Sequence, residues 1–331
     1  MASSRARSSH RIVSRLLMVA LAAIALGSWP AFAEPPAQAA SPTTAGAWSL
    51  RDGDRVVFLG DTFVEREGDR GFIETALVAS HPDASLTFRN LGWSGDTVWA
   101  ESRGVFDQPS KGYERMLALV RDLKPSIVFV AYGRNESYKG EAGLTDFRKQ
   151  LEKLCEDLRG TATPAPDNAA ANPGAMRLVL VTPHRFEAAA GDARNAALEL
   201  YAQAIRDVAG HEQAGLVDLF AQMPTTKPSA TPLTENGVHL SNAGYAEAAR
   251  VFVTASGHAL PADFAARSEK LRTQVVDKNR LFFHRWRPAN ETYIFLFRKH
   301  EQGNNAVEIP QFDPLVETAE QQVRSIAKGT R

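Results

Sequence analysis

Five short apolar runs alternate with amphipathic stretches between residues 54 and 254, and this alternation limits the possible folds most strongly. The runs are rich in β-branched and aromatic residues without polar alternation, as in strands buried on both faces. They cover residues 56–59, 86–91, 126–132, 177–182 and 216–219. The stretches with helical spacing cover residues 71–80, 113–123, 144–158, 193–209 and 242–253. This order predicts a parallel sheet with helices on both faces and right-handed crossovers.

The first 33 residues have the pattern of a cleavable export signal. Arginines 5, 7, 11 and 15 precede a short apolar core at 16–26, and Ala31-Phe32-Ala33 fits a cleavage site. The core is short for a membrane span, so we expect a periplasmic or secreted chain that starts at Glu34, with no stable membrane insertion. An uncleaved N-terminal anchor is the alternative.

Composition divides the remainder into three parts. Residues 34–50 are rich in Pro, Ala, Ser and Thr and predict a linker, before a main domain at 51–256. Within that domain the Ala/Pro/Asn-rich segment 161–175 predicts a disordered insertion. The extension 257–331 predicts a helix through Asn279, followed by interleaved aromatic and basic residues. We expect these aromatics to pack on the main domain.

Charge and motif content exclude several classes of function. Without the four arginines of the signal, 34 basic residues face 38 acidic ones, so the mature chain has a net charge of −4. That balance argues against nucleic acid as a partner. No metal-ligand spacing and no phosphate-binding glycine loop occurs, so we expect neither a metal nor another cofactor.

Polar residues follow three of the predicted strands and precede the last helix. They are Thr62, Gly95, Asn135 and His239. Since the carboxyl ends of parallel strands share one edge of the sheet, these residues should converge there. A hydroxyl, an imidazole, a backbone N–H and an amide N–H₂ are the parts of an acyl-transfer site, so a small-molecule ester is an expected substrate.

These blocks resemble those of the SGNH (GDSL-like) hydrolase family over residues 54–254. Gly60-Asp61-Thr62 is similar to the Gly-Asp-Ser block, and Asn90-Leu-Gly-Trp-Ser-Gly-Asp-Thr97 to the second block. Gly133-Arg-Asn-Glu136 is similar to Gly-x-Asn-Asp, and Asn236-Gly-Val-His239 to Asp-x-x-His. The resemblance implies a flavodoxin-like three-layer sandwich around a five-stranded parallel sheet. It also implies that Thr62 attacks, that His239 is the base, and that Gly95 and Asn135 form the oxyanion hole.

Two positions depart from the family pattern. Thr62 replaces the family's Ser, and its extra methyl group restricts the side chain and crowds the approach to a carbonyl. Asn236 replaces the Asp that orients the histidine, and an amide stabilises an imidazolium poorly. The neighbouring Glu235 is an alternative partner for His239, if the backbone presents it.

Five further residues next to the blocks are candidates for contact with substrate. They are Asp61, Trp93, Ser94, Arg134 and His184. Three of them also have a structural alternative: Asp61 can brace the turn, Trp93 can belong to the core, and His184 can be a surface residue.

The extension also resembles another family. Together with the second block, Lys278-Asn-Arg-Leu-Phe-Phe-His-Arg-Trp-Arg-Pro288 looks like a secreted SGNH-domain family of planctomycete-type bacteria. That resemblance implies a matched domain and tail.

Two functions of different class follow. The first is an exported esterase that removes an acyl group, expected on a carbohydrate. The second is an SGNH-fold module without catalysis that binds or assembles components of the cell envelope, which the changes at Thr62 and Asn236 favour.

Overall fold

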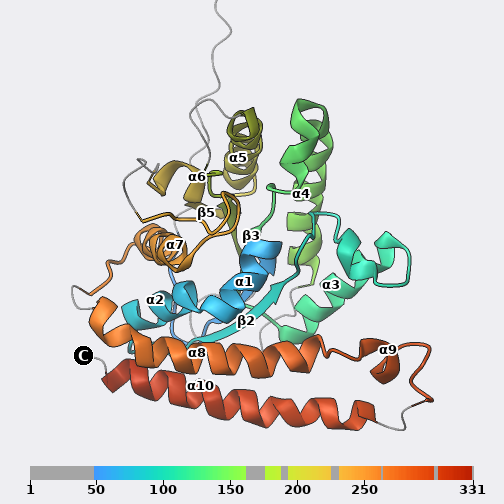
Figure 1. Cartoon of the computed structure of the whole chain (residues 1–331), viewed down its shortest axis with the longest axis vertical. Coiled ribbons are helices and arrows are strands. Elements are labelled where there is room, and N and C mark those ends of the chain that lie inside the picture. Colours follow the sequence, from blue (N-terminus) through green and yellow to red (C-terminus); the bar gives the residue numbers. More distant parts are fainter. Residues whose placement is uncertain are drawn as a thin grey trace, which may run out of the picture. The chain divides into compact units, whose positions relative to one another are not determined.

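The computed structural model describes residues 48–161, 176–187, 193–224, 231–261, 264–301 and 305–329. Its centre is a parallel sheet of five strands in the order β2-β1-β3-β4-β5 (Figure 1). The strands are β1 (Arg55–Gly60), β2 (Thr87–Gly92), β3 (Ile127–Ala131), β4 (Arg177–Thr182) and β5 (Gly215–Asp218). Gly60 pairs with Gly92 on one side and with Ala131 on the other, so three carboxyl ends lie level. The predicted α/β fold with a five-stranded parallel sheet is confirmed.

Helices cover both faces of this sheet (Figure 1). Strand β1 explains why, since Val56 and Phe58 belong to one apolar core while Val57 and Leu59 belong to another. The first core includes side chains of α2 (Phe72–Ser80) and α7 (Asn242–Ala255). The second includes side chains of α3 (Pro109–Leu123), α4 (Leu144–Gly160) and α5 (Ala193–His211). The remaining elements of the main domain are α1 (Thr62–Arg70), α6 (Leu219–Gln222) and the 3-10 helices η1 (Glu101–Gly104) and η2 (Glu136–Gly143).

The start of the folded domain lies earlier than the sequence indicated. Trp48 and Leu50, which fall in the predicted linker, are buried. The Trp48 indole donates to the carbonyl of Leu216 at 3.2 Å and meets the ring of Phe129 edge to face. Composition did not indicate this earlier start, because a single tryptophan contributes little to the composition of a Pro/Ala-rich segment. The predicted signal, the rest of the linker and residues 162–175 of the predicted insertion lie outside the described residues.

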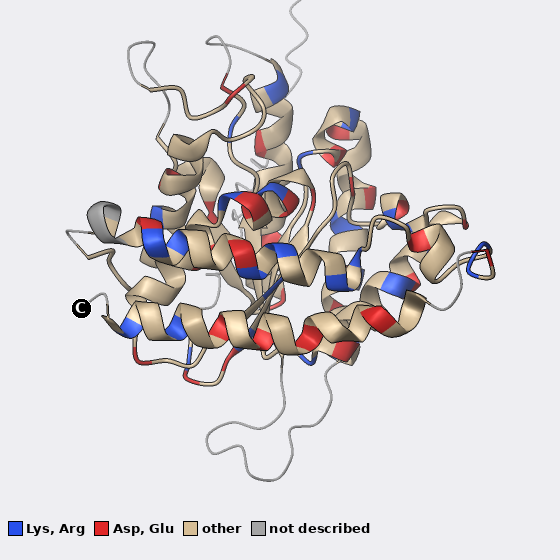
Figure 2. Ribbon diagram, turned by 60° about the horizontal axis from the view of Figure 1, so that its bottom comes forward, with Lys and Arg blue, Asp and Glu red and all other residues tan. Residues whose placement is uncertain are grey.

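The C-terminal extension is helical well beyond Asn279. It comprises α8 (Phe264–Trp286), α9 (Glu291–Ile294), η3 (Asn305–Gln311) and α10 (Phe312–Gly329). Helices α8 and α10 lie side by side in opposite directions, with bands of both charges along them (Figures 1 and 2). None of the helices in the described ranges is long and apolar enough to cross a membrane.

Buried charges attach this extension to the main domain. The ammonium of Lys278, which is fully buried, lies 2.7 Å from the carboxylate of Glu74 on α2. Glu320 of α10 accepts from Arg89 of β2 at 2.7 Å. Removing one partner of a buried pair leaves an uncompensated charge and typically costs about 3–5 kcal/mol. These pairs therefore hold α8 and α10 against the sheet and α2.

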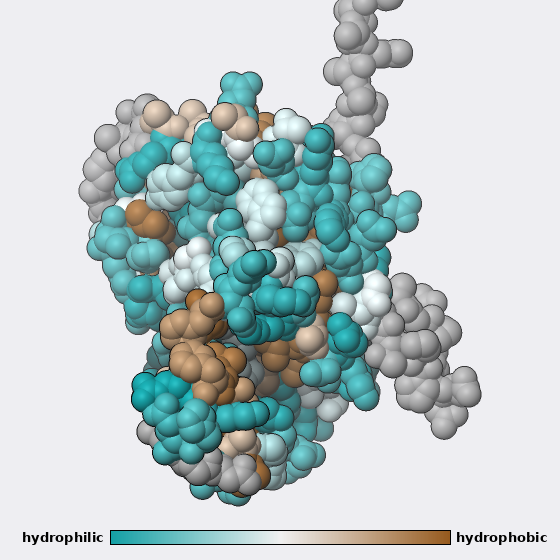
Figure 3. Space-filling view, turned by 90° about the vertical axis from the view of Figure 1, so that its right-hand side faces the viewer, coloured by the Kyte–Doolittle hydropathy of each residue, from teal (hydrophilic) through white to brown (hydrophobic). Residues whose placement is uncertain are grey.

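The aromatic residues of the extension behave in two ways. Phe282 is buried in the second core, as expected. Phe297 instead exposes 66% of its surface and meets the exposed ring of Phe106 edge to face at 5.7 Å. Apolar side chains gather on the face that Figure 3 shows, which is the side where α9 lies in Figure 1. The most exposed ring of the extension therefore contacts the main domain through another exposed ring and not through its apolar core.

Candidate active site

Thr62 is the first residue of α1 and follows the end of β1. Gly60 is required there, because a Cβ atom would lie 2.5 Å from the carbonyl oxygen of Ala131. The Asp61 carboxylate caps α1 by accepting the backbone N–H of Phe63 at 2.9 Å. Strand, turn and helix together present the Thr62 hydroxyl at the carboxyl edge of the sheet.

The loop 92–97, which follows β2, brings Gly95 to that hydroxyl. The N–H of Gly95 donates to Thr62 Oγ1 at 3.0 Å. Gly95 has a φ of +75°, a conformation that favours glycine. Its carbonyl accepts from the hydroxyl of Ser102 at 3.1 Å, which fixes the orientation of this residue.

Asn135 lies beside the same loop. Its Nδ2 donates to the carbonyl of Asp96, the residue after Gly95, at 2.6 Å. The adjacent Glu136, which is buried, ties the two segments together by accepting the N–H groups of Val98 and Gly133 at 2.7 and 2.8 Å. Burial raises the pKa of Glu136 to about 7. Thr62, Gly95 and Asn135, predicted from three separate blocks, are thus brought together.

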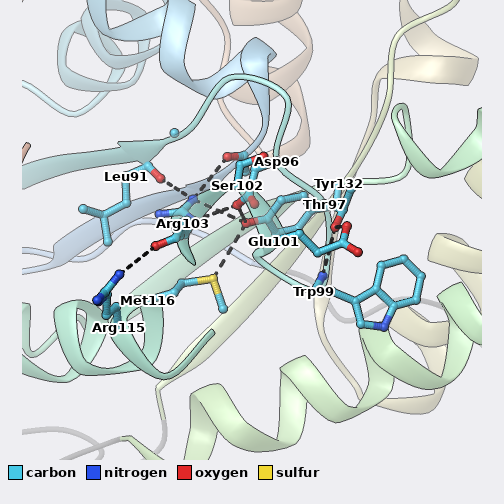
Figure 4. Close-up of polar contacts among 12 residues, drawn as sticks. Leu91, Asp96, Thr97, Trp99, Glu101, Ser102, Arg103, Arg115, Met116 and Tyr132 are labelled. Atoms are coloured by element: carbon cyan, nitrogen blue, oxygen red, sulfur yellow. Dashed lines mark hydrogen bonds and ion pairs between the residues drawn. The ribbon is translucent and has the colours of Figure 1, made fainter. Parts of the chain in front are cut away.

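A buried polar network supports loop 92–97 from behind (Figure 4). The guanidinium of Arg103 donates to Asp96 at 2.6 Å and to the carbonyl of Leu91 at 2.8 Å, and Tyr132 donates to Asp96 at 3.0 Å. Burial raises the pKa of Tyr132 well above its usual value, so its hydroxyl remains a donor. The role of Arg103 was not predicted from the sequence, because nothing marks this residue except its position seven residues after Asp96.

His239 lies in the turn before α7 and is half-buried. Burial lowers its pKa, and the nearby charges of Arg66 and Arg134 lower it further, while Glu235 opposes them. The ring is therefore neutral near pH 7, the form that a general base needs. The structure gives this imidazole no hydrogen bond to any residue in the described ranges.

The residues expected to orient His239 have other partners. The side-chain oxygen of Asn236 accepts the backbone N–H groups of Val238 and His239, at 3.1 and 2.9 Å. The carboxylate of Glu235 pairs with Arg66 at 2.5 Å and also with Arg70. Asn236 thus shapes the turn, and Glu235 acts on the imidazole only through its charge.

Three of the proposed substrate contacts are buried. Asp61 is 3% exposed, and burial raises its pKa to about 6. Arg134 donates to the carbonyl of His184 and lies over the ring of Phe186, and burial lowers its pKa to about 10. Burial also lowers the pKa of His184 well below its usual value. These three side chains are thus buried and are not exposed to a substrate.

Trp93 and Ser94 precede Gly95 on loop 92–97, and both contact other parts of the protein. The hydroxyl of Ser94 donates to the Glu65 carboxylate at 2.6 Å. The ring of Trp93 lies 3.6 Å from the guanidinium carbon of Arg287, a residue of the extension. Sequence analysis singled out neither Glu65 nor the role of Arg287.

Within the described ranges, no group of three or more His, Cys, Asp or Glu side chains is arranged to hold a metal ion. The groups that converge are the Thr62 hydroxyl and the N–H donors of Gly95 and Asn135, and the neutral imidazole of His239 lies in the turn before α7. This set can stabilise an oxyanion that forms next to Thr62.

Comparison with solved structures agrees with the fold. No curated protein matches the chain. A variant of Axe2, an acetyl xylan esterase from Geobacillus stearothermophilus, is similar in structure with a TM-score of 0.50 and 20% identity, over 64% of this chain and 98% of its own. LAE5, an alpha/beta hydrolase enzyme from the metagenome of Lake Arreo, Spain, is 22% identical over 63% of this chain and 97% of its own, with a TM-score of 0.49.

The sequence itself gives the assignment. A model of one family matches residues 44–247, which include all four blocks and more than half of the chain. The chain belongs to the GDSL-like lipase/acylhydrolase family.

Proposed function

We propose that this protein is an exported esterase in which Thr62 is the nucleophile and His239 the general base. The hydrogen bond of 3.0 Å between the Gly95 N–H and Thr62 Oγ1 carries this proposal. It puts an oxyanion donor within reach of the atom that would attack. Membership of an acylhydrolase family supports the reaction class.

The reaction proceeds in two steps, acylation of Thr62 and hydrolysis of the acyl–Thr62 ester. Thr62 Oγ1 forms a bond to the ester carbonyl carbon while His239 takes the hydroxyl proton. The oxygen of the tetrahedral intermediate accepts from the Gly95 N–H and the Asn135 amide. The intermediate then expels the alcohol, which receives the proton from His239. Water, which gives a proton to His239 as it attacks, cleaves the acyl–Thr62 ester. The carboxylic acid leaves, and His239 returns the proton to Thr62 Oγ1.

The electrostatics around His239 limit the rate of this chemistry. The imidazolium that forms in each step lies near the positive charges of Arg66 and Arg134. The Glu235 carboxylate, which pairs with Arg66 and Arg70, offsets part of that charge. We therefore expect slow turnover compared with a site in which a carboxylate bonds to the imidazole.

We further propose an acyl group on a carbohydrate as the substrate, delivered outside the cytoplasm. The substrate class is suggested by the acetyl xylan esterase among the similar structures. Export is suggested by residues 1–33. N-terminal sequencing of the protein from an expressing bacterium should find Glu34 first, and an intact Met1 would contradict export by cleavage.

Turnover of a short-chain acyl ester and of an acetylated xylo-oligosaccharide tests the mechanism. Thr62→Ala and His239→Ala should each abolish hydrolysis, while the surface changes Thr145→Ala and His211→Ala should leave it unchanged. Full activity of either site variant would contradict the proposal.

The second function, a binding module without catalysis, has one observation in its favour. Both side chains that could orient His239 are engaged elsewhere, since Asn236 bonds the backbone and Glu235 bonds two arginines. The doubly substituted Thr62→Ser, Asn236→Asp variant separates the two functions. If the wild type is inert and this variant hydrolyses esters, the binding module is the better reading.

A further inference from the structure

We infer that the C-terminal extension takes part in the site through Arg287, which positions the loop that carries Gly95. In this role Arg287 is a positioning residue that touches no reacting atom. The inference rests on the proposed esterase function, because it concerns the oxyanion donor of that reaction.

A continuous chain of contacts leads from Arg287 to loop 92–97. The guanidinium of Arg287 lies 2.5 Å from the carboxylate of Glu65. That carboxylate also accepts the backbone N–H of Ser94 at 2.9 Å and its hydroxyl at 2.6 Å. Glu65 lies in the first turn of α1, three residues after Thr62, so it joins the helix of the nucleophile to the loop of Gly95.

The charge of Glu65 fits this role. Burial alone would raise its pKa, but the hydrogen bonds from Ser94 and the charge of Arg287 outweigh burial and lower it. Glu65 is thus ionised at neutral pH, and a charge-assisted hydrogen bond is stronger than a neutral one. Arg287 supplies the nearest positive charge that the structure gives this carboxylate within the described ranges.

Arg287 also makes a cation–π contact with the ring face of Trp93. Its guanidinium carbon lies 3.6 Å from the centre of the Trp93 ring, and that of Arg103 lies 5.6 Å from it. The backbone N–H of Trp93 donates to the carbonyl of Gly60 at 3.0 Å. The two residues before Gly95 are therefore fixed, one by the Arg287 side chain directly and one through Glu65.

The extension has other attachments, so the contact of Arg287 is separable from docking. Lys278 pairs with Glu74 on α2, and Glu320 pairs with Arg89 on β2. Between α1 and α8, beside the contact, lies a cavity of about 320 Å³ lined by Glu65, Gly92 and Asn279 among others. Apolar packing is thus incomplete at this point, and the polar contacts of Arg287 make the connection to the loop.

Loss of the guanidinium should loosen the loop without releasing the extension. Removing an oxyanion donor lowers kcat by about 10²–10³-fold, and misplacing one should cost less. We expect Arg287→Ala to lower kcat by about tenfold with little change in KM. Arg287→Lys keeps the charge beside Glu65 but loses the planar contact with Trp93, so its kcat should lie between those of wild type and Arg287→Ala.

Hydrogen exchange and steady-state kinetics on the mature chain test the inference together. The matched control is Arg285→Ala, because Arg285 lies in the last turn of α8, two residues before Arg287, and pairs with Asp313 inside the extension. Exchange at residues 92–97 should rise in Arg287→Ala but not in Arg285→Ala, and kcat should fall only in the former. Thermal unfolding checks that both variants are folded. If Arg287→Ala does not fold, Arg287→Lys takes its place in the same comparison.

Unchanged exchange at residues 92–97 in Arg287→Ala would overturn the inference. So would faster exchange with an unchanged kcat, since the contact would then stabilise the loop without serving the reaction. If the wild type hydrolyses no ester, the esterase proposal fails by itself, and exchange alone decides whether Arg287 holds the loop.

Discussion

Replacing Glu67 by Gln should remove a large pH dependence of stability. Glu67 lies on α1, is 3% exposed, and accepts the N–H groups of Ile73 and Glu74 through one oxygen, at 2.6 and 3.2 Å. Its other carboxyl oxygen is buried without a hydrogen bond to any described residue. Burial raises the pKa of Glu67 from 4.5 to about 8. The folded protein therefore keeps a proton on Glu67 at pH 7, which the unfolded chain releases.

This difference between the folded and unfolded states sets the direction in which stability changes with pH. Glu67 contributes its full stability below pH 4.5, where both states hold the proton, and that contribution is lost as the pH rises toward about 8. At about 1.4 kcal/mol per pH unit, the total loss is about 5 kcal/mol. About 3 kcal/mol of it falls between pH 5 and pH 8.

Urea unfolding at pH 5, 6, 7 and 8, followed by circular dichroism, measures this loss. Glu67→Gln keeps the acceptor for Ile73 and Glu74 but cannot ionise. The free energy of unfolding of this variant, minus that of the wild type, should therefore increase by about 3 kcal/mol from pH 5 to pH 8. The exposed change Glu114→Gln should give no such trend. Parallel curves for wild type and Glu67→Gln would refute an elevated pKa at Glu67.

Three further predictions concern the site and its support. Glu235→Gln leaves Arg66 and Arg70 uncompensated, so the pKa of His239 should fall, the acidic limb of the pH–rate profile should move to lower pH, and kcat should decrease. An unmoved acidic limb would show that Glu235 does not act on the base. Asn236→Asp should raise kcat at pH 7 by about tenfold or more, because a carboxylate stabilises the imidazolium, and no gain would show that the turn keeps this side chain on the backbone. Gly92→Ala puts a Cβ atom 2.1 Å from the backbone nitrogen of Glu65, so it should lower the free energy of unfolding in urea by about 1–3 kcal/mol. In the control Gly160→Ala the new Cβ meets nothing within 4 Å, and the loss should be less than about 0.5 kcal/mol.

The strands of this fold were predictable because they are buried on both faces. Each apolar run marked its strand to within about two residues, and the blocks predicted that Thr62, Gly95 and Asn135 lie at one edge of the sheet. Helix α1 was not predicted, because only Val64 and Glu67 of its nine residues are buried and its sequence is mostly charged. Helix α10, which packs mainly against α8, was missed as well.

The partners of the site residues could not be read from sequence. Asn236 and Glu235 stand next to each other, yet one bonds the turn and the other bonds α1. Only the local backbone geometry decides between these partners and His239. The pairing of Glu65 with Arg287 joins positions 222 residues apart, and no pattern near either residue indicates the other.

That separation has a consequence for the order in which the protein forms. Contacts between distant parts of a chain form late, because closing a long loop costs entropy before the contact contributes any stability. Thr62 and Gly95 are synthesised well before Arg287 and before Lys278, whose ion pair anchors α8. A chain interrupted before α8 would hold all four family blocks but lack this support of loop 92–97. Synthesis of α8 and Arg287 therefore precedes completion of the site.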